Sequence, residues 1–395
     1  MFDITIEQST LMKALEYLEP TVGKNINGLG DNCISMLTTG NGSVQLYTTN
    51  TIECTVVEAI VAVGGGSADQ CPYIDFKRLK SIVASIPENE MISLKATVND
   101  VMLNFGMQAT PMKIVGDNNG MIPLPLNTFG SMVTLPKYWV KDALNNACAI
   151  IENSSASPIY NCIRFYTNGL SVEATALDVN NKRTFVQYGQ STVNNATQEI
   201  LVEAPKLKKS MRLFEDFNEM EFSMDANMIL IEAADPIAHY NMKTRGMISG
   251  IKYYCRRLSG NFPAHLAQTL QPQPYEFIEV NREEMLSCFN RVKAIEDQTS
   301  ANLISFEATG SNVQIALATS LGSIEENVSA NNALTTGFKT VFKYPNISDI
   351  LKTMVSATFE IGVLPQHPTN FVVRSPQDKG TMFTVPSMIG GGSTP

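Results

Sequence analysis

A repeated pattern constrains this 395-residue chain more than any other feature. An alternating strand, a polar cap and an amphipathic helix occur in that order three times, at 2–15, 132–144 and 277–289. A second pattern of strand, helix and hairpin follows each copy, at 73–105, 201–233 and 339–375. Because two patterns rarely recur by chance in one order and at similar spacing, we expect three domains of one α+β fold, each with two helices packed on antiparallel sheets.

Two stretches rich in turn-forming residues, 116–130 and 268–276, separate the copies. Gly, Pro and Asn interrupt regular structure, so these stretches are expected to join domains. The predicted domains are residues 1–128, 129–272 and 273–395, and the last ends in a short flexible tail. The period is far longer than that of a solenoid, so the copies are domains rather than stacked motifs.

Positive charge is concentrated on the predicted helices. These helices span 7–19, 76–86, 136–151, 204–214, 281–295 and 343–355, and they hold 15 of the 29 lysines and arginines but only seven acids. Their net charge is therefore +8, whereas the rest of the chain carries −17 within a total of −9. A single basic helix is more often a solvated face. Three domains with the same arrangement favour a shared basic surface, which would contact phosphates without reading base sequence.

Other residue patterns argue against an enzyme and against a bound cofactor or metal. The seven cysteines form no Cys-x-x-Cys pair, and none of the three histidines lies at metal-ligand spacing from a cysteine. The triple glycine at 64–66 lacks the Gly-Lys-Ser/Thr ending of a phosphate-binding loop. The longest apolar runs are strand-sized and the chain opens directly on a strand pattern, so a cytoplasmic protein without a membrane partner is expected.

Four segments carry a resemblance to a known family. RRLSGNFPAHLAQTL (256–270) resembles an R-L-x-G-x-F-P-x-Y segment, and ATALDVNNKR (174–183) is similar to an A-T-D-x-x-R element. IEVNREEMLSCFNRVKAI (278–295) resembles the opening of a third domain, and TMFTVPSMI (381–389) resembles a V-V-M-P-M-R-L terminus. Together, and in this order along nearly the whole chain, they resemble the bacterial DNA polymerase III β subunit, the sliding clamp.

The resemblance implies three tandem copies of the DNA-clamp fold and a head-to-tail homodimer that forms a six-domain ring. Such a ring encircles duplex DNA and keeps the replicative DNA polymerase attached to it, after an ATP-dependent clamp loader has placed the ring. Helices line the bore and sheets lie outside. The protein would then be a processivity factor in DNA replication, and a non-catalytic one.

Three groups of residues follow from the charge pattern and the resemblance. The expected DNA contacts are the basic residues Lys24, Lys77, Arg78, Lys80, Lys137, Lys141, Lys206, Lys209, Arg212, Arg282, Lys343 and Lys352. A hydrophobic cleft for partner peptides, between the second and third domains, would use Tyr160, Pro263, Leu270, Phe383, Val385, Pro386, Met388 and Ile389. The subunit contact would pair Met112 and Ile114 with Ala294 and Ile295.

The chain also departs from the family. GMISGIKYYC (246–255) reads as an insertion that reshapes the peptide cleft, and Val-Pro-Ser-Met-Ile replaces the usual ending. Such divergence would suit a clamp encoded by a phage or another mobile element, which would work in the host cytoplasm. The alternative is a non-catalytic, β-rich structural or assembly protein of a virus. That alternative does not account for basic residues concentrated on helices.

Overall fold

The computed structural model describes residues 2–23, 32–39, 42–50, 53–64, 70–114, 132–151, 158–215, 217–233, 248–258, 260–263, 274–295, 302–309, 312–319, 322–331, 337–364 and 370–387. These residues divide into two compact units. The first comprises Met1–Tyr138 and Lys209–Arg257, and the second comprises Trp139–Lys208 and Leu258–Pro395. Each unit thus contains part of the middle repeat.

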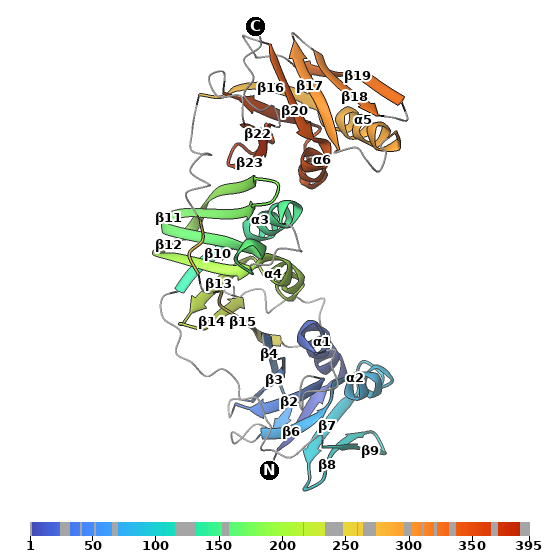
Figure 1. Ribbon diagram of the computed structural model, residues 1–395. Coiled ribbons are helices and arrows are strands. Elements are labelled where there is room, and N and C mark those ends of the chain that lie inside the picture. The colour runs from blue at the N-terminus through green and yellow to red at the C-terminus, as the bar shows by residue number, and fades with distance from the viewer. Residues whose placement is uncertain are drawn as a thin grey trace. The chain divides into compact units, whose positions relative to one another are not determined.

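The first unit contains two antiparallel sheets. The smaller has the order β5 (Val63–Gly64), β1 (Asp3–Glu7), β7 (Met91–Ala96), β8 (Asp100–Phe105) and β9 (Gln108–Lys113). The larger has the order β10 (Met132–Pro136), β13 (Glu219–Met224), β14 (Met228–Ala233), β15 (Ile248–Arg256), β4 (Glu53–Ile60), β3 (Ser43–Thr49), β2 (Cys33–Thr38) and β6 (Gln70–Asp75). In Figure 1, β2, β3 and β4 lie next to one another in this sheet.

Local sequence determines where the two helices of the first repeat begin and end. α1 (Gln8–Leu18) passes into the 3₁₀ turn η1 (Glu19–Thr21), where Pro20 cannot continue an α-helix. α2 (Phe76–Ala84) begins at Asp75, whose carboxylate accepts a hydrogen bond from the Arg78 backbone N–H at 2.7 Å. α1 packs on α2 and on β4.

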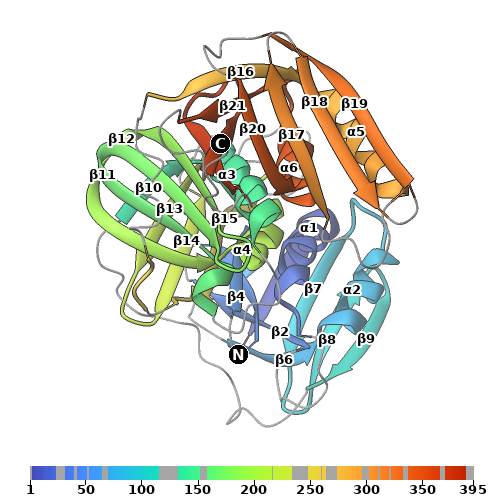
Figure 2. The same cartoon turned by 45° about the horizontal axis from the view of Figure 1, so that its top comes forward.

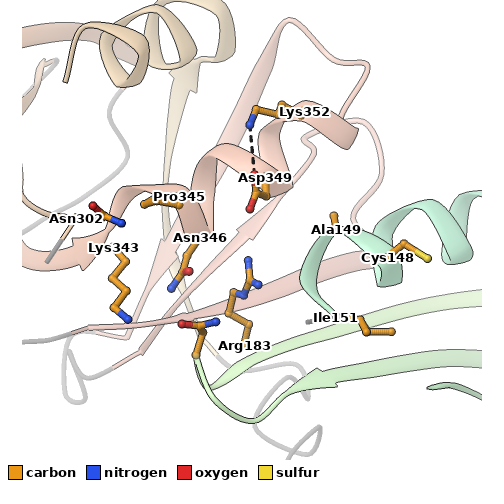
Figure 3. Close-up of a pocket in the computed structure, with 11 residues that line it drawn as sticks. Cys148, Ala149, Ile151, Arg183, Asn302, Lys343, Pro345, Asn346, Asp349 and Lys352 are labelled. Atoms are coloured by element: carbon orange, nitrogen blue, oxygen red, sulfur yellow. Dashed lines mark hydrogen bonds and ion pairs between the residues drawn. The ribbon is translucent and has the colours of Figure 1, made fainter. Parts of the chain in front are cut away.

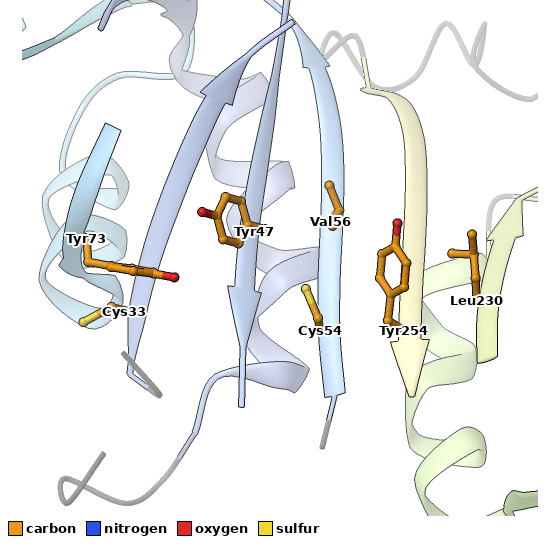
Figure 4. Close-up of a cluster of buried hydrophobic side chains, with 7 residues drawn as sticks. All are labelled: Cys33, Tyr47, Cys54, Val56, Tyr73, Leu230 and Tyr254. Carbon is orange, nitrogen blue, oxygen red and sulfur yellow. The ribbon is translucent and has the colours of Figure 1, made fainter. Parts of the chain in front are cut away.

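Strands of the middle repeat complete the larger sheet of the first unit. β15 pairs with β14 on one side and with β4 on the other. A buried cluster crosses this junction and is drawn in Figure 4: Cys33, Tyr47, Cys54, Val56, Tyr73, Leu230 and Tyr254. The rings of Tyr47 and Tyr73 meet edge to face with centroids 6.4 Å apart. Because the cluster contains residues of the first and the middle repeats, we infer that burying its apolar side chains stabilises the packing of these two repeats in one sheet.

The interpretation of 246–255 as an insertion was wrong. Residues 248–256 form β15, with neighbours on both edges in the eight-stranded sheet. Ile251, Tyr253, Tyr254 and Cys255 are buried. Because successive residues of a strand point to opposite faces, β15 buries side chains on both faces of the sheet, and the segment therefore belongs to the fold.

The second unit is built on a single antiparallel sheet. Its order is β11 (Cys162–Asp178), β12 (Arg183–Glu203), β23 (Thr381–Pro386), β22 (Asn370–Arg374), β21 (Thr358–Val363), β16 (Glu276–Asn281), β19 (Gly322–Asn331), β18 (Asn312–Thr319), β17 (Leu303–Thr309) and β20 (Phe338–Lys343). Here β12 of the middle repeat pairs with β23 of the third. Figure 2 shows β11 and β12 as a long two-stranded hairpin.

Helices of the second unit follow the predicted ranges closely. They are α3 (Lys137–Ile150), α5 (Arg282–Ala294) and α6 (Tyr344–Thr353), together with the 3₁₀ turn η3 (Pro158–Asn161). α5 begins at Asn281, which accepts from the Glu284 N–H at 3.0 Å, and α6 has Pro345 in its first turn. α5 packs on α6, with the Phe289 and Tyr344 rings 5.8 Å apart.

The remaining helix, α4 (Ala204–Ser210), continues as the 3₁₀ turn η4 (Met211–Phe214). The chain passes from one unit to the other inside α4, as it also does near the start of α3. All six predicted helices are therefore confirmed, and their ends differ from the predicted ends by at most two residues where the helix is purely α. The predicted domain boundaries stay a prediction. The joint at 116–130 lies outside the described residues, as does most of the joint at 268–276. No helix among the described residues is long and apolar enough to cross a membrane.

Candidate DNA-binding and partner-binding sites

Five of the predicted DNA contacts are exposed cations on helices. Lys77 and Arg78 lie on α2, Lys141 on α3, Lys209 on α4 and Arg212 on η4, and none of them has an ion pair with a described residue. Free cations on the solvent side of amphipathic helices are suited to contact phosphates, because they need not break an existing pair first. Lys24 lies outside the described residues.

Four other predicted DNA contacts are engaged within the protein. Lys80 pairs with Glu19 at 3.0 Å, and Lys137 donates to the carbonyl oxygen of Glu215 at 2.5 Å. Lys206 pairs with Glu203 at 2.5 Å, three residues earlier in the chain. Arg282 donates through Nη1 to the Leu351 carbonyl oxygen at 3.3 Å, which ties α5 to the end of α6.

One carboxylate lies next to Lys141, the exposed cation of α3. Burial, followed by the negative charge of Asp378, raises the pKa of Asp142, while the adjacent Lys141 opposes the rise. The Asp142 carboxylate next to Lys141 is therefore protonated more readily than that of an isolated aspartate.

The last two predicted DNA contacts, Lys343 and Lys352, line a pocket of about 600 Å³ within the second unit. Its walls come from the end of α3, the turn of the β11–β12 hairpin, the first turns of α6 and the residue before β17. The lining residues are Cys148, Ala149, Ile151, Asn181, Arg183, Asn302, Lys343, Pro345, Asn346, Asp349 and Lys352, and Figure 3 draws them. Seven of these eleven are polar or charged, so this is not a mainly apolar cavity.

The ATALDVNNKR motif builds one wall of the pocket. Asp178 ends β11 and accepts from the backbone N–H of Asn181 at 3.0 Å, and Lys182 adopts a left-handed φ of 53°. Arg183 then begins β12 and donates to the Asp178 carboxylate through Nε at 2.9 Å and Nη2 at 2.7 Å. Its Nη2 also donates to the Ile150 carbonyl oxygen at 2.9 Å, which holds the end of α3. The turn thereby places a buried arginine at the pocket.

Two further groups define the chemistry of this pocket. Burial raises the pKa of the Cys148 thiol, and the charge of Lys208 only partly offsets the rise, so this thiol stays protonated. Lys352 pairs with Asp349 on the same helix at 3.2 Å, whereas Lys343 has no acidic partner among the described residues. The pocket thus contains an unpaired positive charge.

The predicted peptide-cleft residues lie elsewhere. Phe383 and Val385 are 1% and 0% exposed, and the Phe383 ring packs on Phe185 with centroids 5.3 Å apart. These two side chains are therefore core rather than surface. Tyr160, Pro263 and Pro386 are half-buried, and Leu270, Met388 and Ile389 lie outside the described residues. None of the predicted cleft residues lines the pocket.

Residues predicted for the subunit contact differ in accessibility. Met112 is 1% exposed and belongs to the core, whereas Ile114 is half-buried and makes an isolated β-bridge with Ile74. Ala294 is exposed at the end of α5 and Ile295 is half-buried. β9, which contains Met112, is an edge strand of the five-stranded sheet. Its outer backbone groups can accept a further strand.

The described residues contain no group of three or more His, Cys, Asp or Glu side chains that could hold a metal ion. Of the eleven pocket residues, sequence reasoning assigned only Lys343 and Lys352 to a site, and it missed the other nine, Asn181, Arg183 and Asn302 among them. The motif around Arg183 was visible in the sequence, but nothing local placed it near the first turn of α6.

Comparison with known proteins shows which of them share this fold. No protein-family profile matches the chain, and no curated protein matches its sequence. Solved structures do match it. The DNA polymerase III subunit β from Pseudomonas aeruginosa superposes with a TM-score of 0.80 at 12% identity, over 98% of this chain and 100% of its own. The DNA polymerase sliding clamp from Bacillus subtilis superposes with a TM-score of 0.79 at 14% identity, over 98% and 99%. The chain therefore has the fold of the DNA polymerase III β subunit, the sliding clamp.

Proposed function

We propose that this protein is a DNA sliding clamp that encircles duplex DNA and tethers a replicative DNA polymerase. The observation that carries the proposal is the match to sliding clamps along 98% of the chain, with TM-scores of 0.79 and 0.80. The exposed cations on α2, α3, α4 and η4 support it independently. A fold is no proof of function by itself, so the charge distribution matters here.

The charge distribution suits topological rather than tight binding. Helices that carry +8 within a chain of net charge −9 attract phosphates locally, while the remaining surface repels DNA. Contacts to phosphate oxygens do not depend on base sequence and weaken with salt, so a ring held by such contacts can move along the duplex. The protein would need no catalytic group for this task.

A ring requires a second copy of this chain, since three repeats form half of a six-domain ring. We infer a homodimer whose contact uses the edge strand β9 and Ile114 of one protomer and Ala294 and Ile295 of its partner. Backbone pairing along β9 would supply most of the contact, because Met112 is buried within its own protomer. An ATP-dependent clamp loader would open this ring, and the site of action is the cytoplasm.

Retention on circular DNA tests the function. The protein is placed on a nicked circular duplex with a bacterial clamp loader and ATP, and the protein–DNA complex is isolated by gel filtration at moderate salt. We expect the protein to stay on the circle and to leave after a restriction enzyme linearises the DNA. Bulky blocks on both linear ends should restore retention, because they prevent sliding off.

Equal loss from circular and linear DNA would contradict the ring. A viral assembly protein with this fold would ignore DNA topology altogether, and an ordinary basic DNA-binding protein would be indifferent to the end blocks. The solution mass provides a second readout, since a ring predicts two copies of the 43.3 kDa chain.

A further inference from the structure

Within the chain, strand pairing of one kind joins neighbouring repeats. β15, the last strand of the middle repeat, pairs with β4 of the first repeat at seven positions. β23, the last strand of the third repeat, pairs with β12 of the middle repeat at four positions. β4 and β12 are each the second strand of a hairpin between the two helices of their repeat. The last strand of one repeat thus pairs with a hairpin strand of the repeat before it.

Two strands of these same kinds lack this pairing among the described residues. β9 is the last strand of the first repeat and an edge strand, with β8 as its neighbour and an isolated bridge from Ile114 to Ile74 beyond its end. β19 is the corresponding hairpin strand of the third repeat, and it meets β16 only through Ala330 and Asn331. In the homodimer proposed above, β9 of one protomer would therefore pair with residues 322–329 in β19 of its partner.

The register of the β8–β9 hairpin shows which backbone groups of β9 face away from β8. Phe105 and Gln108 pair across a two-residue turn in which Gly106 has a φ of 53°. The closing pair of such a hairpin exchanges both of its hydrogen bonds, and every second pair after it does the same. Ile114 fits this alternation, because its N–H donates inward to the Asn99 carbonyl oxygen at 3.4 Å. The outward residues of β9 are therefore Ala109, Pro111 and Lys113.

The outward backbone groups of β19 follow from one hydrogen bond. Ser329 pairs with Asn312 of β18, yet its N–H donates to the carboxylate of Glu284 on α5 at 3.1 Å. This N–H therefore points away from β18. Since the direction alternates along a strand, the other outward residues of β19 are Ser323, Glu325 and Asn327.

Pro111 interrupts the outward row of β9 at its centre. Proline has no backbone N–H, so it is tolerated in an edge strand where that group would face away from the sheet. When β9 pairs with β19, one outward carbonyl oxygen of β19 meets the Pro111 ring in place of a donor. The paired residues of the two junctions within the chain contain no proline. The junction between protomers therefore has a gap that the junctions within a protomer lack.

We propose that Pro111 makes the contact between protomers the weakest joint of the ring, so that the ring opens there while its internal junctions stay paired. A missing backbone hydrogen bond together with an unsatisfied carbonyl group weakens each contact by about tenfold. A two-subunit ring has two such contacts, so the closed dimer is about a hundredfold weaker than one with complete pairing. The inference rests on the proposed function, because it states what limits the lifetime of the closed ring.

Pro111→Ala tests the proposal, since it restores the N–H with little change in the side chains of the contact. The dimer dissociation constant of the full-length protein is measured without DNA by sedimentation equilibrium. We expect it to fall by about a hundredfold relative to the native protein. Exchange of protomers between an isotopically labelled and an unlabelled sample, followed by native mass spectrometry, should slow by about tenfold or more.

Pro87→Ala is the matched control. Pro87 is exposed between α2 and β7 of the same unit and belongs to no strand. The substitution has the same effect on the entropy of the unfolded chain, and we expect it to leave both measurements unchanged. Equal thermal unfolding of the two variants verifies that both are folded.

Three results would overturn the proposal. They are an unchanged dissociation constant in Pro111→Ala, an equal change in both proline variants, and assembly of Pro111→Ala into species larger than a dimer. The last result would show that Pro111 protects a free edge against unspecific pairing. A dimer that is insensitive to Pro111 would leave the circular-DNA function intact, whereas a native protein that stays monomeric at every concentration would refute the ring and this inference with it.

Discussion

Gly189 on β12 lies directly under the indole of Trp139, and we expect Gly189→Ala to destabilise the second unit. A Cβ atom at this position would lie 2.2 Å from Trp139 Nε1 and 2.8 Å from both Cδ1 and Cε2. Carbon and nitrogen atoms at rest stay about 3.5 Å apart, so the indole would have to move by about 1 Å. Trp139 is 6% exposed and packs on Phe165 at 6.0 Å, so its fused ring has little space to do so.

The expected destabilisation is about 2 kcal/mol. Overpacking a core generally costs about 1–3 kcal/mol, and a rigid ring places this substitution in the upper part of that range. The reduced backbone freedom of alanine in the unfolded chain returns about 0.4–1 kcal/mol. With a urea m-value of about 2–3 kcal/mol/M, the midpoint should fall by roughly 0.7–1 M.

Trp139 is the only tryptophan in the chain, so its fluorescence reports unfolding at the site of the substitution. Gly337→Ala is the matched control in the same unit, because the nearest atom to its Cβ would be the Ala308 carbonyl oxygen at 3.6 Å. We expect it to leave the midpoint almost unchanged. The same substitution in a Trp139→Leu background completes a double-mutant cycle, with urea unfolding followed by circular dichroism because the tryptophan is absent. The smaller, flexible leucine should accommodate the added methyl group at little cost in stability. An unchanged midpoint in Gly189→Ala, or an equal loss in the Trp139→Leu background, would refute the reasoning.

Three further outcomes are expected. Asp178→Ala should destabilise the second unit by about 3–5 kcal/mol, because it leaves the guanidinium of Arg183 buried without its carboxylate partner. Urea unfolding followed by circular dichroism measures this loss, and a change below about 1 kcal/mol would contradict the expectation. Burial raises the pKa of the Cys54 thiol to about 12, so it should resist maleimide in the folded protein at about pH 8 and react after denaturation. The same shift lowers stability as pH rises from 9.0 toward 12, because the unfolded chain releases the proton first. Arg212→Ala should weaken DNA binding equally for all base sequences and reduce the slope of log affinity against log salt by about 1; a sequence-dependent loss would argue for base contacts.

Local sequence was sufficient to predict the helices. Helical spacing of apolar residues, caps such as Asp75 and Asn281, and Pro20 after α1 act within a few residues of one another. The strand–helix–hairpin order of all three repeats was predictable for the same reason. These signals do not depend on which strands later become neighbours.

Long-range pairing could not be predicted in the same way. The segment 246–255 was interpreted as an insertion, whereas 248–256 forms β15, and one of its two partner strands, β4, belongs to the first repeat, far from it in sequence. Phe383 and Met112 were assigned to surfaces, although both are buried. An apolar residue on a strand has the same local pattern whether it faces a core or a partner, and only the packing of the sheets distinguishes the two.

The sequence by itself determined the repeat, the six helices and the concentration of positive charge on them, because periodicity and composition are properties of neighbouring residues. Only the tertiary structure decided which cations remain free and which form a pocket. Arg183, Asn302 and Lys343 are 119 and 41 residues apart along the chain, yet they line one cavity. Such a site exists only after β20, the β11–β12 turn and α3 have been brought together by the pairing and packing of the ten-stranded sheet.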